Sequence, residues 1–409
     1  MALKKYALSD VCTIVPGFAF KSNEFGSGEN IAVKIKDIEP PSVNIKNAER
    51  VCFTPQDKFR LSKGDYIMAM TGATIGKVGK LQIDAKNVYI NQRVCKFNPI
   101  TNVCDKEYLY YVLSAPSFRN FIYNNVDSKL AQPNIGHPTI YKYTHLFPTD
   151  IKEQKLIASV LNNIDRKIEL NKQINDNLEA MAKQLYDYWF VQFDFPNEEG
   201  KPYKSSGGAL VWNEKLKREI PQEWSYCKLK DFINLFDSKR VPLSSKDRGE
   251  RQGVYPYYGA TGIMDYVNDY IFDGDYILLA EDGSTSDAKG FPIVQYIWGK
   301  NWVNNHAHII LPKNEQSTMF TYQMLRSIPA KQIETGSIQK KISQENLCGY
   351  KMVLPNSNLL EKYENVVSPL WEKRKRCIEE INTLTRQRDE LLPLLMNGQA
   401  SVNYHLSDD

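Results

Sequence analysis

The strongest constraint on the fold is an internal repeat, because motifs of the first half of the chain return in the second after about 210 residues. The tetrapeptide Gly64–Ile67 (GDYI) recurs unchanged as Gly274–Ile277. Three looser matches follow in the same order: Tyr89–Gln92 with Trp302–Asn305, Gln132 and Ile135 with Gln339 and Ile342, and Leu146–Pro148 with Val353–Pro355. One short match arises easily by chance, but four in order indicate a duplicated unit. The sequence therefore predicts two similar globular parts, each followed by a helix.

The globular parts are predicted to be mostly β. Short segments rich in β-branched and aromatic residues are bounded by Gly, Asn and Asp, which is typical of strands and turns. These segments are Tyr66–Met70, Val88–Phe97, Tyr276–Ala280 and Ala307–Leu311. Short helices are expected around Glu107–Leu113 and Met319–Arg326. The fold class is therefore expected to be α+β.

Two long helices are predicted from apolar residues spaced three and four apart. The first begins after Pro148, with Asp150 as N-cap and Glu153 completing a capping box. For the second, Ser368 and Pro369 suggest a cap followed by a first-turn proline, and Pro393 should kink or end the helix. The expected pairing residues are Ile157, Leu161, Ile164 and Ile168, then after a slip Ile174, Leu178, Met181 and Leu185, and in the second helix Cys377, Ile381, Leu384, Leu391 and Leu395.

Each predicted helix is a charged rod with one apolar stripe, so it needs a partner stripe. Because the two halves repeat, the simplest arrangement is an antiparallel coiled coil between the two helices, related by a pseudo-two-fold axis. The alternative is that each helix folds back on its own globular part. The stretch Ile151–Phe190 would span about 60 Å if it were wholly helical. A paired rod of that length would hold two similar domains apart.

The domain organisation follows from these elements. The segment Phe195–Pro221 is rich in Pro, Gly, Ser and charged residues and is predicted to be a surface linker. The predicted parts are a first globular domain at 1–150, a central helical spacer at 151–195, a linker at 196–220, a second globular domain at 221–357 and a C-terminal helical spacer at 358–402.

Composition narrows the class of protein. The chain has no run of about 18 apolar residues, as a membrane span would need, and its start lacks the apolar core of a signal peptide. The seven cysteines are widely spread and form no Cys-x-x-Cys pair. We therefore expect a cytoplasmic protein with reduced thiols, no membrane association and no metal site. The net charge of +4 comes mainly from residues 1–150, which weakly favours a phosphate-binding first domain.

Motifs of catalysis are absent from the sequence. There is no phosphate-binding Gly-x-x-x-x-Gly-Lys-Ser/Thr loop, no Gly-x-Ser-x-Gly elbow and no Asn/Asp-Pro-Pro-Tyr/Phe motif of amino-methyltransferases. His306 and His308 share a face of a strand but lack a third ligand nearby, so a structural or DNA-facing role is favoured over a metal site. Glu281–Gly283 is more typical of a turn than of a catalytic carboxylate pair. The sequence therefore predicts no catalytic residues.

Several polar loops carry groups suited to DNA. Amide and guanidinium groups pair with adenine and guanine edges, and Lys and Arg neutralise phosphates. Such loops recur at matching places in both halves. This recurrence supports contact with DNA about as well as it supports loops that are merely exposed to solvent. The candidate DNA-binding residues are Thr71, Thr74, Lys77, Asn91, Gln92, Arg93, Lys129, Gln132 and Asn134 in the first half, and Lys239, Arg240, Tyr257, Tyr258, Thr261, Asn305, His306, Gln339, Lys340 and Lys341 in the second.

Taken in order along the chain, these motifs resemble the specificity subunits of Type I restriction-modification systems. The resemblance rests on Gly64–Ile67 followed by Thr71–Val78 (TGATIGKV), Glu153-Gln154, Ile164–Ile168 (IDRKI), Leu185–Phe195 (LYDYWFVQFDF), Tyr255–Ile263 (YPYYGATGI) and Leu391–Gly398 (LLPLLMNG). Each motif is weak alone, and the match covers nearly the whole chain. One departure is Glu361-Lys362 where the first half has Glu153-Gln154.

The resemblance implies two target-recognition domains that contact a bipartite DNA site, joined by an antiparallel helical spacer. It also implies double-stranded DNA, two methyltransferase subunits and two translocase-endonuclease subunits as partners. The chain would be non-catalytic and bind no cofactor, whereas S-adenosylmethionine, ATP and Mg²⁺ would be used by the partners. The alternatives are a coiled-coil scaffold that binds only protein, and a degenerate methyltransferase or nuclease.

Overall fold

The computed structural model describes residues 2–126, 133–314, 317–336 and 339–402. The chain divides into two compact units. The first unit takes the residues up to Lys172 together with those from Glu379 onward, and the second unit runs from Gln173 to Ile378. Each unit therefore combines one globular domain with one end of each long helix.

The described strands of the first unit form three sheets. A six-stranded sheet has the order β2-β10-β7-β8-β5-β4, a three-stranded sheet has the order β6-β3-β9, and β1 pairs with β11. The strands are β1 (Leu3–Ala7), β2 (Cys12–Pro16), β3 (Phe25–Val33), β4 (Ile38–Glu39), β5 (Ser42–Val43), β6 (Glu49–Val51), β7 (Tyr66–Ala69), β8 (Val78–Lys80), β9 (Val88–Ile90), β10 (Val94–Pro99) and β11 (Thr144–Pro148).

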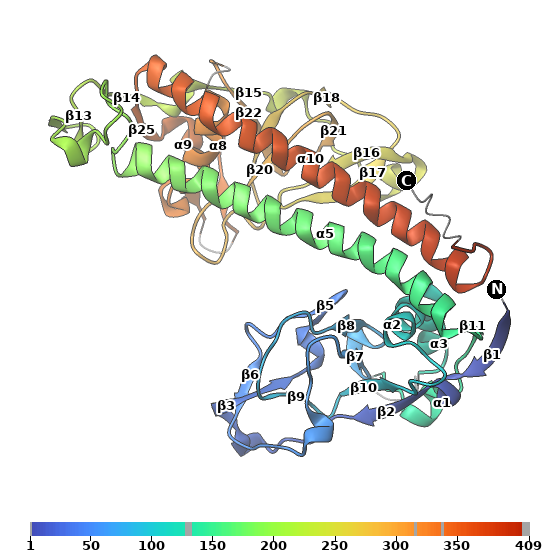
Figure 1. Cartoon of the computed structure of the whole chain (residues 1–409). Helices are drawn as coiled ribbons and strands as arrows, with labels where there is room; N and C mark the ends of the chain where they lie inside the picture. Colours follow the sequence, from blue (N-terminus) through green and yellow to red (C-terminus); the bar gives the residue numbers. More distant parts are fainter. Residues whose placement is uncertain (1, 127–132, 315–316, 337–338, 403–409) are drawn as a thin grey trace, which may run out of the picture. The chain divides into compact units, whose positions relative to one another are not determined.

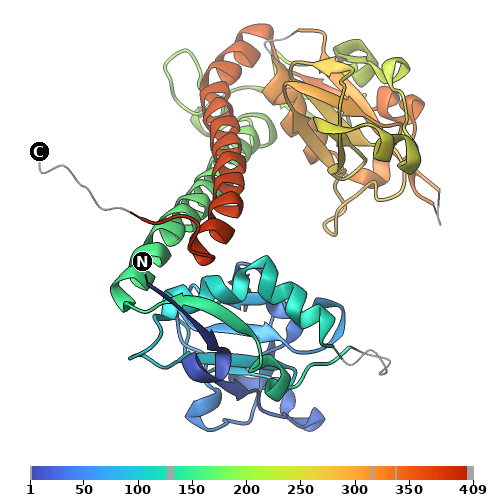
Figure 2. The same cartoon turned by 90° about the vertical axis from the view of Figure 1, so that its right-hand side faces the viewer.

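The helices of the first domain are short and amphipathic. They are α1 (Leu8–Val11), α2 (Lys106–Ser114), α3 (Pro116–Asn124) and α4 (His137–Ile140). Asp105 caps α2, because its carboxylate accepts from the amides of Glu107 and Tyr108 over 3.0 Å. Both views show α2 and α3, in cyan, lying against the strands of this domain (Figure 1, Figure 2). The core between them is apolar and buries Tyr66, Phe97 and Phe118.

The second unit repeats this plan. A sheet of order β15-β22-β19-β20 corresponds to β2-β10-β7-β8, and β14 pairs with β25 as β1 pairs with β11. The strands are β14 (Ser225–Lys228), β15 (Ile233–Leu235), β16 (Gln252–Tyr258), β17 (Ile263–Val267), β18 (Phe272–Asp273), β19 (Tyr276–Ala280), β20 (Val294–Ile297), β21 (Lys300–Val303), β22 (Ala307–Pro312), β23 (Glu334–Thr335), β24 (Lys341–Ile342) and β25 (Lys351–Leu354). The short helices are α6 (Leu229–Phe232), α7 (Ser245–Glu250), α8 (Thr318–Ser327) and α9 (Gln344–Gly349).

The predicted repeat and the predicted α+β class are confirmed at the level of strands. In the first unit, β3 pairs in parallel with β9 and antiparallel with β6. In the second unit, β16 likewise pairs in parallel with β21 and antiparallel with β17. The shared tetrapeptide is nevertheless offset by one residue. Tyr66 packs into the main core of its unit, whereas Ile277 takes that place in the second unit and Tyr276 packs on the other side of the sheet. A shift of one residue in a strand turns each side chain to the opposite face.

The two long helices are α5 (Ile151–Tyr186), extended by a π-helical turn at Asp187–Val191, and α10 (Ser357–Met396). Asp150 caps α5 as predicted, since its carboxylate accepts from the Lys152 amide over 2.8 Å. The predicted cap of the second helix at Ser368 is wrong, because Asn356 accepts from the Leu359 amide over 2.9 Å and α10 continues through Pro369. The buried side chains of the added turns, from Leu359 to Val367, offset the cost of about 3 kcal/mol for an interior proline.

Within each unit the two helices pair antiparallel. In the first unit, Asp165 accepts from Arg388 over 3.0 Å and Asn171 donates to Glu380 over 2.9 Å. In the second unit, Glu179 accepts from Arg374 over 2.7 Å and the Ala182 carbonyl accepts from Tyr363 over 3.2 Å. Partner numbers on α10 fall as numbers on α5 rise, which is the predicted direction, and Figure 1 shows α5 and α10 side by side.

The seam of α5 differs from the predicted one in its middle. The prediction for Met181 is wrong, because its side chain is 49% exposed and the seam passes through the buried Ala182 instead. The three-four spacing runs without a slip from Ile168 through the buried Asn171 to Leu178. The other predicted pairing residues are buried or partly buried. The buried ones are Ile157, Leu161, Cys377 and Leu395. The partly buried ones are Ile164, Ile174, Leu185, Ile381, Leu384 and Leu391.

The segment predicted as a surface linker is folded against the second unit. It contains a hairpin of β12 (Leu210–Asn213) and β13 (Arg218–Pro221). Phe195 stacks on Trp224 with ring centroids 5.1 Å apart, and both side chains are buried. Among the helices of the described residues, none has the length and apolar character needed to cross a membrane.

Candidate nucleic-acid interface

Three loops of the first unit meet beside the end of β7. The Met70 amide donates to the Arg93 carbonyl over 2.9 Å, which ties the loop after β7 to the loop between β9 and β10. The Gly72 amide donates to the Pro133 carbonyl over 2.9 Å, and the Ile135 amide donates to the Met70 carbonyl over 3.1 Å. Loops that the sequence places far apart, around residues 72, 93 and 134, therefore form one surface.

The second unit brings the corresponding three loops together. The Glu281 amide donates to the His306 carbonyl over 2.8 Å, as Met70 does to Arg93. The Ile342 amide donates to the Glu281 carbonyl over 2.8 Å, as Ile135 does to Met70. The bridge between Asp282 and Lys341 likewise matches the bridge between Thr71 and Asn134. The two units therefore present the same three-loop surface, here called the loop surface of each domain.

The candidate residues of the first loop surface divide by exposure. Gln92, Arg93 and Asn134 are exposed, and Lys77 is partly exposed. The hydroxyl oxygens of Thr71 and Thr74 are buried, so these two side chains are less available than predicted. Lys129 and Gln132 lie outside the described residues.

Asn91 is not available for base contacts, which corrects its prediction. Asn91 is 7% exposed, and its backbone N–H donates to the Val33 carbonyl over 2.9 Å. Asn304 is its counterpart in the second unit, since it is 3% exposed and its backbone N–H donates to the Tyr258 carbonyl over 3.0 Å. The backbone at this shared position thus ties the loop to a neighbouring strand in each domain.

In the second domain most candidates are exposed, and the predictions for Tyr257 and Arg240 are wrong. The exposed ones are Lys239, Thr261, Asn305, His306, Gln339, Lys340 and Lys341. Tyr257 is 1% exposed and its hydroxyl oxygen accepts from the Leu243 amide over 2.9 Å. Tyr258 is partly buried, and burial raises the pKa of its hydroxyl to about 12.

Arg240 is the second wrong prediction, because its guanidinium is engaged inside the domain. One nitrogen donates to Glu281 over 2.7 Å and to the Ala307 carbonyl over 2.8 Å, and Nε donates to the Asp237 carbonyl over 3.0 Å. An arginine with its donors satisfied by protein groups is not free to bind phosphate.

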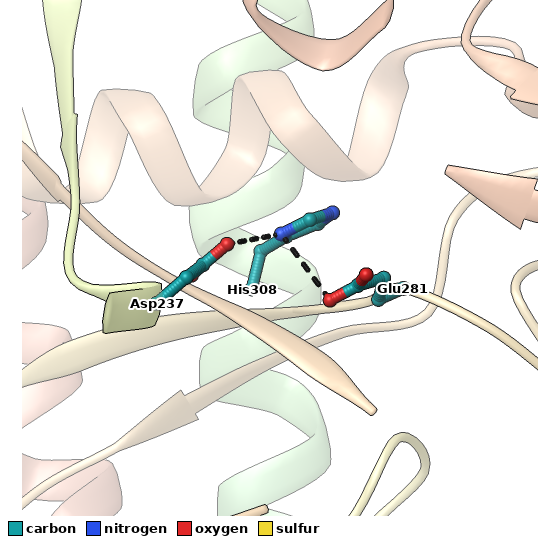
Figure 3. A group of neighbouring side chains, drawn as sticks. All are labelled: Asp237, Glu281 and His308. Atoms are coloured by element: carbon teal, nitrogen blue, oxygen red, sulfur yellow. Dashed lines mark hydrogen bonds and ion pairs between the residues drawn. The ribbon is translucent and has the colours of Figure 1, made fainter. Parts of the chain in front are cut away.

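Below the loop surface of the second domain lies a buried charged cluster of Asp237, Arg240, Glu281 and His308, here called the ionic cluster. Figure 3 shows both carboxylates directed at the same imidazole nitrogen. His308 Nδ1 lies 2.6 Å from Asp237 and 3.8 Å from Glu281, and Nε2 lies 2.8 Å from the Ile342 carbonyl. Both ring nitrogens of His308 therefore face oxygen atoms of the protein.

The carboxylates of the ionic cluster are held in the charged form. Burial raises the pKa of Asp237, but hydrogen bonds from His308 and the Ile309 amide outweigh it and leave the pKa lowered. Burial also raises the pKa of Glu281, and Arg240, His308 and Lys341 together bring it below its usual value. A carboxylate–carboxylate–imidazole set could bind a cation, but the Arg240 guanidinium already occupies the space between the carboxylates.

Sequence reasoning found only part of this cluster. His308 carried a signal, because a histidine in a buried strand needs polar partners. Asp237 carried none, since it lies 71 residues away from His308 in the chain and only the pairing of β15 with β22 brings them together.

The domain model described as the Type I restriction modification DNA specificity domain matches residues 2–180 and 221–362, which is more than half of the chain. The chain belongs to this family. A specificity subunit of the Type I restriction enzyme MjaIX of Methanocaldococcus jannaschii is 24% identical over 315 residues, covering 72% of this chain and 69% of the relative. The putative MjaX specificity subunit of the same organism is 23% identical over 428 residues and covers 97% and 93%.

A solved structure supports the shared fold. The Type I restriction-modification S subunit from M. genitalium has a TM-score of 0.61 at 18% sequence identity, over 97% of this chain and 96% of that one. As a member of the specificity family, the chain recognises DNA sequence. The two matched segments correspond to the two domains that carry a loop surface.

Proposed function

We propose that each domain of this specificity subunit contacts one half of a bipartite DNA site through its loop surface. The observation that carries the proposal is the recurrence of the same three hydrogen-bonded loops in both units. The exposed side chains differ between the two surfaces, with Gln92, Arg93 and Asn134 in the first and Asn305, His306 and Lys341 in the second. Different donor and acceptor patterns in the major groove select different base pairs, so the two halves of the site would differ in sequence.

We also propose that the chain is a non-catalytic subunit and that methylation and cleavage belong to its partners. The predicted complex has two methyltransferase and two translocase-endonuclease subunits, which would use S-adenosylmethionine, ATP and Mg²⁺. The chain would direct adenine methylation by presenting the target base for flipping into a partner's pocket.

The methyltransferase partners are proposed to dock at the ends of the long helices. Met181, Leu185 and Tyr188 line a groove at the end of α5, and the exposed Val191 follows in the turn after α5. These four apolar residues are here called the α5 apolar surface. Three of these side chains are strongly exposed, at 49% for Met181, 37% for Tyr188 and 51% for Val191. Exposed apolar patches of this kind mark protein interfaces.

The repeat provides a second place for a methyltransferase. Near the end of each long helix an exposed apolar residue precedes two buried ones: Tyr188 before Trp189 and Phe190, and Leu394 before Leu395 and Met396. Two similar sites on one chain suit two copies of one partner.

Methylome sequencing of the host with and without this chain tests the proposed function. We expect methylated adenines in a split motif to disappear when the chain is removed. Exchanging residues 1–150 for the corresponding domain of a relative should change one half of the motif and leave the other half unchanged. A motif that is unaffected by loss of the chain would contradict the proposal.

The scaffold alternative is tested separately. The methyltransferase partner is assayed for binding to a duplex of the identified motif, with and without this chain. A protein-only scaffold predicts equal binding in both cases, whereas a specificity subunit predicts specific binding only when the chain is present. Methylation by the chain alone would instead support the degenerate enzyme.

A further inference from the structure

Among the described residues, a cluster of this kind occurs in the second repeat and not in the first. The shared hydrogen bonds of the loops, Met70 to Arg93 and Glu281 to His306, fix which residues correspond. Arg93 and His306 are therefore equivalent positions. Two residues further along the chain, on β10 and β22, Cys95 is equivalent to His308. Cys95 pairs with Pro16 on β2, whereas the residue bonded to His308 is Asp237, in the turn after β15, which is the strand that corresponds to β2.

The first domain fills the same places with uncharged side chains. Met70 is 8% exposed and Cys95 is fully buried, and both belong to the apolar core of the first unit. Burial raises the pKa of the Cys95 thiol far above its usual value, so this group is neutral. The second domain therefore carries buried charges at positions where the same fold is complete without them. Ion pairs in a buried position seldom add stability over apolar packing, so stability alone does not account for the cluster.

The ionic cluster connects the segments that form the loop surface of the second domain. Arg240 joins the turn after β15 to the start of β22, through the carbonyls of Asp237 and Ala307. Asp237 accepts from the Ile309 amide over 2.8 Å and from the Gln344 side chain over 2.6 Å. Glu281 pairs with Lys341 over 3.2 Å. Four separate segments are thus fixed to one another directly under the surface.

The ionic cluster contacts the loops that carry the exposed side chains above it. His306 is next to Asn305, whose carbonyl accepts from Arg240 over 3.3 Å, and Asp282 directly follows Glu281. His306 Nδ1 and an Asp282 carboxylate oxygen lie 2.6 Å apart on the surface, which leaves His306 Nε2 directed away from that bond. Base recognition requires donors and acceptors held in fixed positions, and a rigid layer beneath them provides that.

We propose that Asp237, Arg240, Glu281 and His308 are positioning residues for the DNA-contacting loops of the second domain. Sequence selectivity in one half of the DNA site then depends on the ionic cluster, and selectivity in the other half does not. The Arg240 guanidinium also lies 3.6 Å from the Asp237 carboxylate and 2.7 Å from the Glu281 carboxylate, which reduces their repulsion of DNA phosphates near the loop surface. This inference rests on the proposed function and assigns a role within one domain.

The main test is the double substitution Arg240→Met with Glu281→Met, which removes one charge of each sign and copies Met70 of the first domain. The full chain is assembled with its methyltransferase partner, and methylation is measured on duplexes that carry each single mismatch in either half of the motif. Exchange of residues 1–150 beforehand shows which half belongs to which domain. The matched control is Lys217→Met with Glu214→Met, an exposed ion pair of 2.9 Å in the β12–β13 hairpin of the same unit.

We expect R240M/E281M to lower discrimination against mismatches in the second domain's half by about tenfold or more, which is the scale of a single base contact. Discrimination in the other half should stay as in the unaltered chain, and the control pair should change neither half. Arg240→Lys should retain part of the selectivity, since one ion pair to Glu281 can still form. A merely structural cluster would lower the Tm and the yield of complex without this one-sided effect.

The isosteric variant Glu281→Gln keeps the proposal testable if the double variant fails to assemble. It removes one charge, preserves the shape of the side chain and is expected to give the same one-sided loss in smaller degree. Unchanged discrimination in both halves by a folded variant would overturn the inference and leave the proposed function intact. If the unaltered chain gives no motif-dependent methylation at all, the proposed function fails instead.

Discussion

The side-chain amide of Asn171 donates a 2.9 Å hydrogen bond to the Glu380 carboxylate, across the pair of long helices. Asn171 occupies a buried position of the three-four repeat, where an apolar residue is usual. Lys167 on the same helix pairs with the same carboxylate. A buried asparagine in a coiled coil selects one register at some cost in stability. The bond therefore serves to fix how α5 and α10 are aligned in the first unit.

Replacement of Asn171 by Leu is predicted to raise the free energy of unfolding by about 1 kcal/mol, since apolar packing replaces a buried amide. Replacement by Asp should lower it, because a second carboxylate would then face the Glu380 carboxylate from a buried position of the helix pair. Urea unfolding of the two variants measures both effects. Equal stability of the Leu and Asp variants would show that the bond contributes nothing to the pairing.

The same pairing explains which changes in helix length the protein should tolerate. Adding one heptad to α5, for instance by repeating residues 168–174, lengthens the helix by about 10 Å, or about three base pairs of DNA. A matching heptad in α10, by repeating residues 377–383, is needed to keep the seams opposed. The double insertion is predicted to lengthen the unspecified spacer of the methylated motif and to leave both half-sites unchanged, as methylome sequencing would report.

The single insertion serves as its control. A heptad in α5 alone leaves a loop of unmatched seam, so the chain should unfold at lower temperature and give little methylation. If the double insertion altered the half-sites while the spacer length stayed the same, the helices would not set the spacing.

The long helices and strands were predictable because each is specified by its own neighbours in sequence. The repeat located Tyr276–Ala280 as a strand, and the spacing of apolar residues located α5. The errors in the helix predictions arise from tertiary contacts, which neighbouring residues in the sequence do not specify. Met181 was assigned to the seam because the pattern skipped Asn171, a polar residue that the structure buries through its bond to Glu380. Propensity alone could not show that packing would carry α10 through Pro369.

The DNA-contacting candidates were predictable as loops but not as exposed or buried side chains. Asn91 and Gln92 are neighbours with similar chemistry, yet only Gln92 is exposed. The difference arises from the parallel pairing of β3 with β9, which no local pattern encodes. Arg240 was assigned to phosphate because its partner Glu281 lies 41 residues away and is reached only through the sheet.

Glu364 on α10 gives the second unit a stability that depends on pH. Burial raises the pKa of its carboxyl from 4.5 to about 7, and hydrogen bonds from the Met319 and Phe320 amides and Ser368 offset only part of this rise. A carboxyl with a raised pKa holds its proton more tightly in the folded state than in the unfolded state. Its contribution to stability is therefore complete below pH 4.5 and is lost as the pH rises through about 7.

Glutamine at position 364 imitates the protonated carboxyl at every pH. Glu364→Gln is expected to change the free energy of unfolding little at pH 5 and to raise it at pH 8 by up to about 3 kcal/mol. Urea unfolding at both pH values measures the difference. Glu361→Gln, at an exposed position on the same helix, is the matched control. An equal effect of Glu364→Gln at both values would contradict the shifted ionisation.

The α5 apolar surface allows the proposed methyltransferase contact to be tested without disturbing the fold. Val191 is 51% exposed and Met181 is 49% exposed, so a charge at either position is tolerated in the free chain. In a complex the same charge would be buried without a partner, which costs several kcal/mol. Met181→Glu and Val191→Glu are therefore predicted to weaken binding of the methyltransferase at least tenfold, measured by titration calorimetry or by size-exclusion chromatography of the mixed subunits. Val254→Glu on β16, at a side chain that is 78% exposed, is the matched control and should leave the affinity unchanged.

Because a second site is proposed at the end of α10, the α5 variants should still bind one methyltransferase, and addition of Leu394→Glu should abolish that remaining binding.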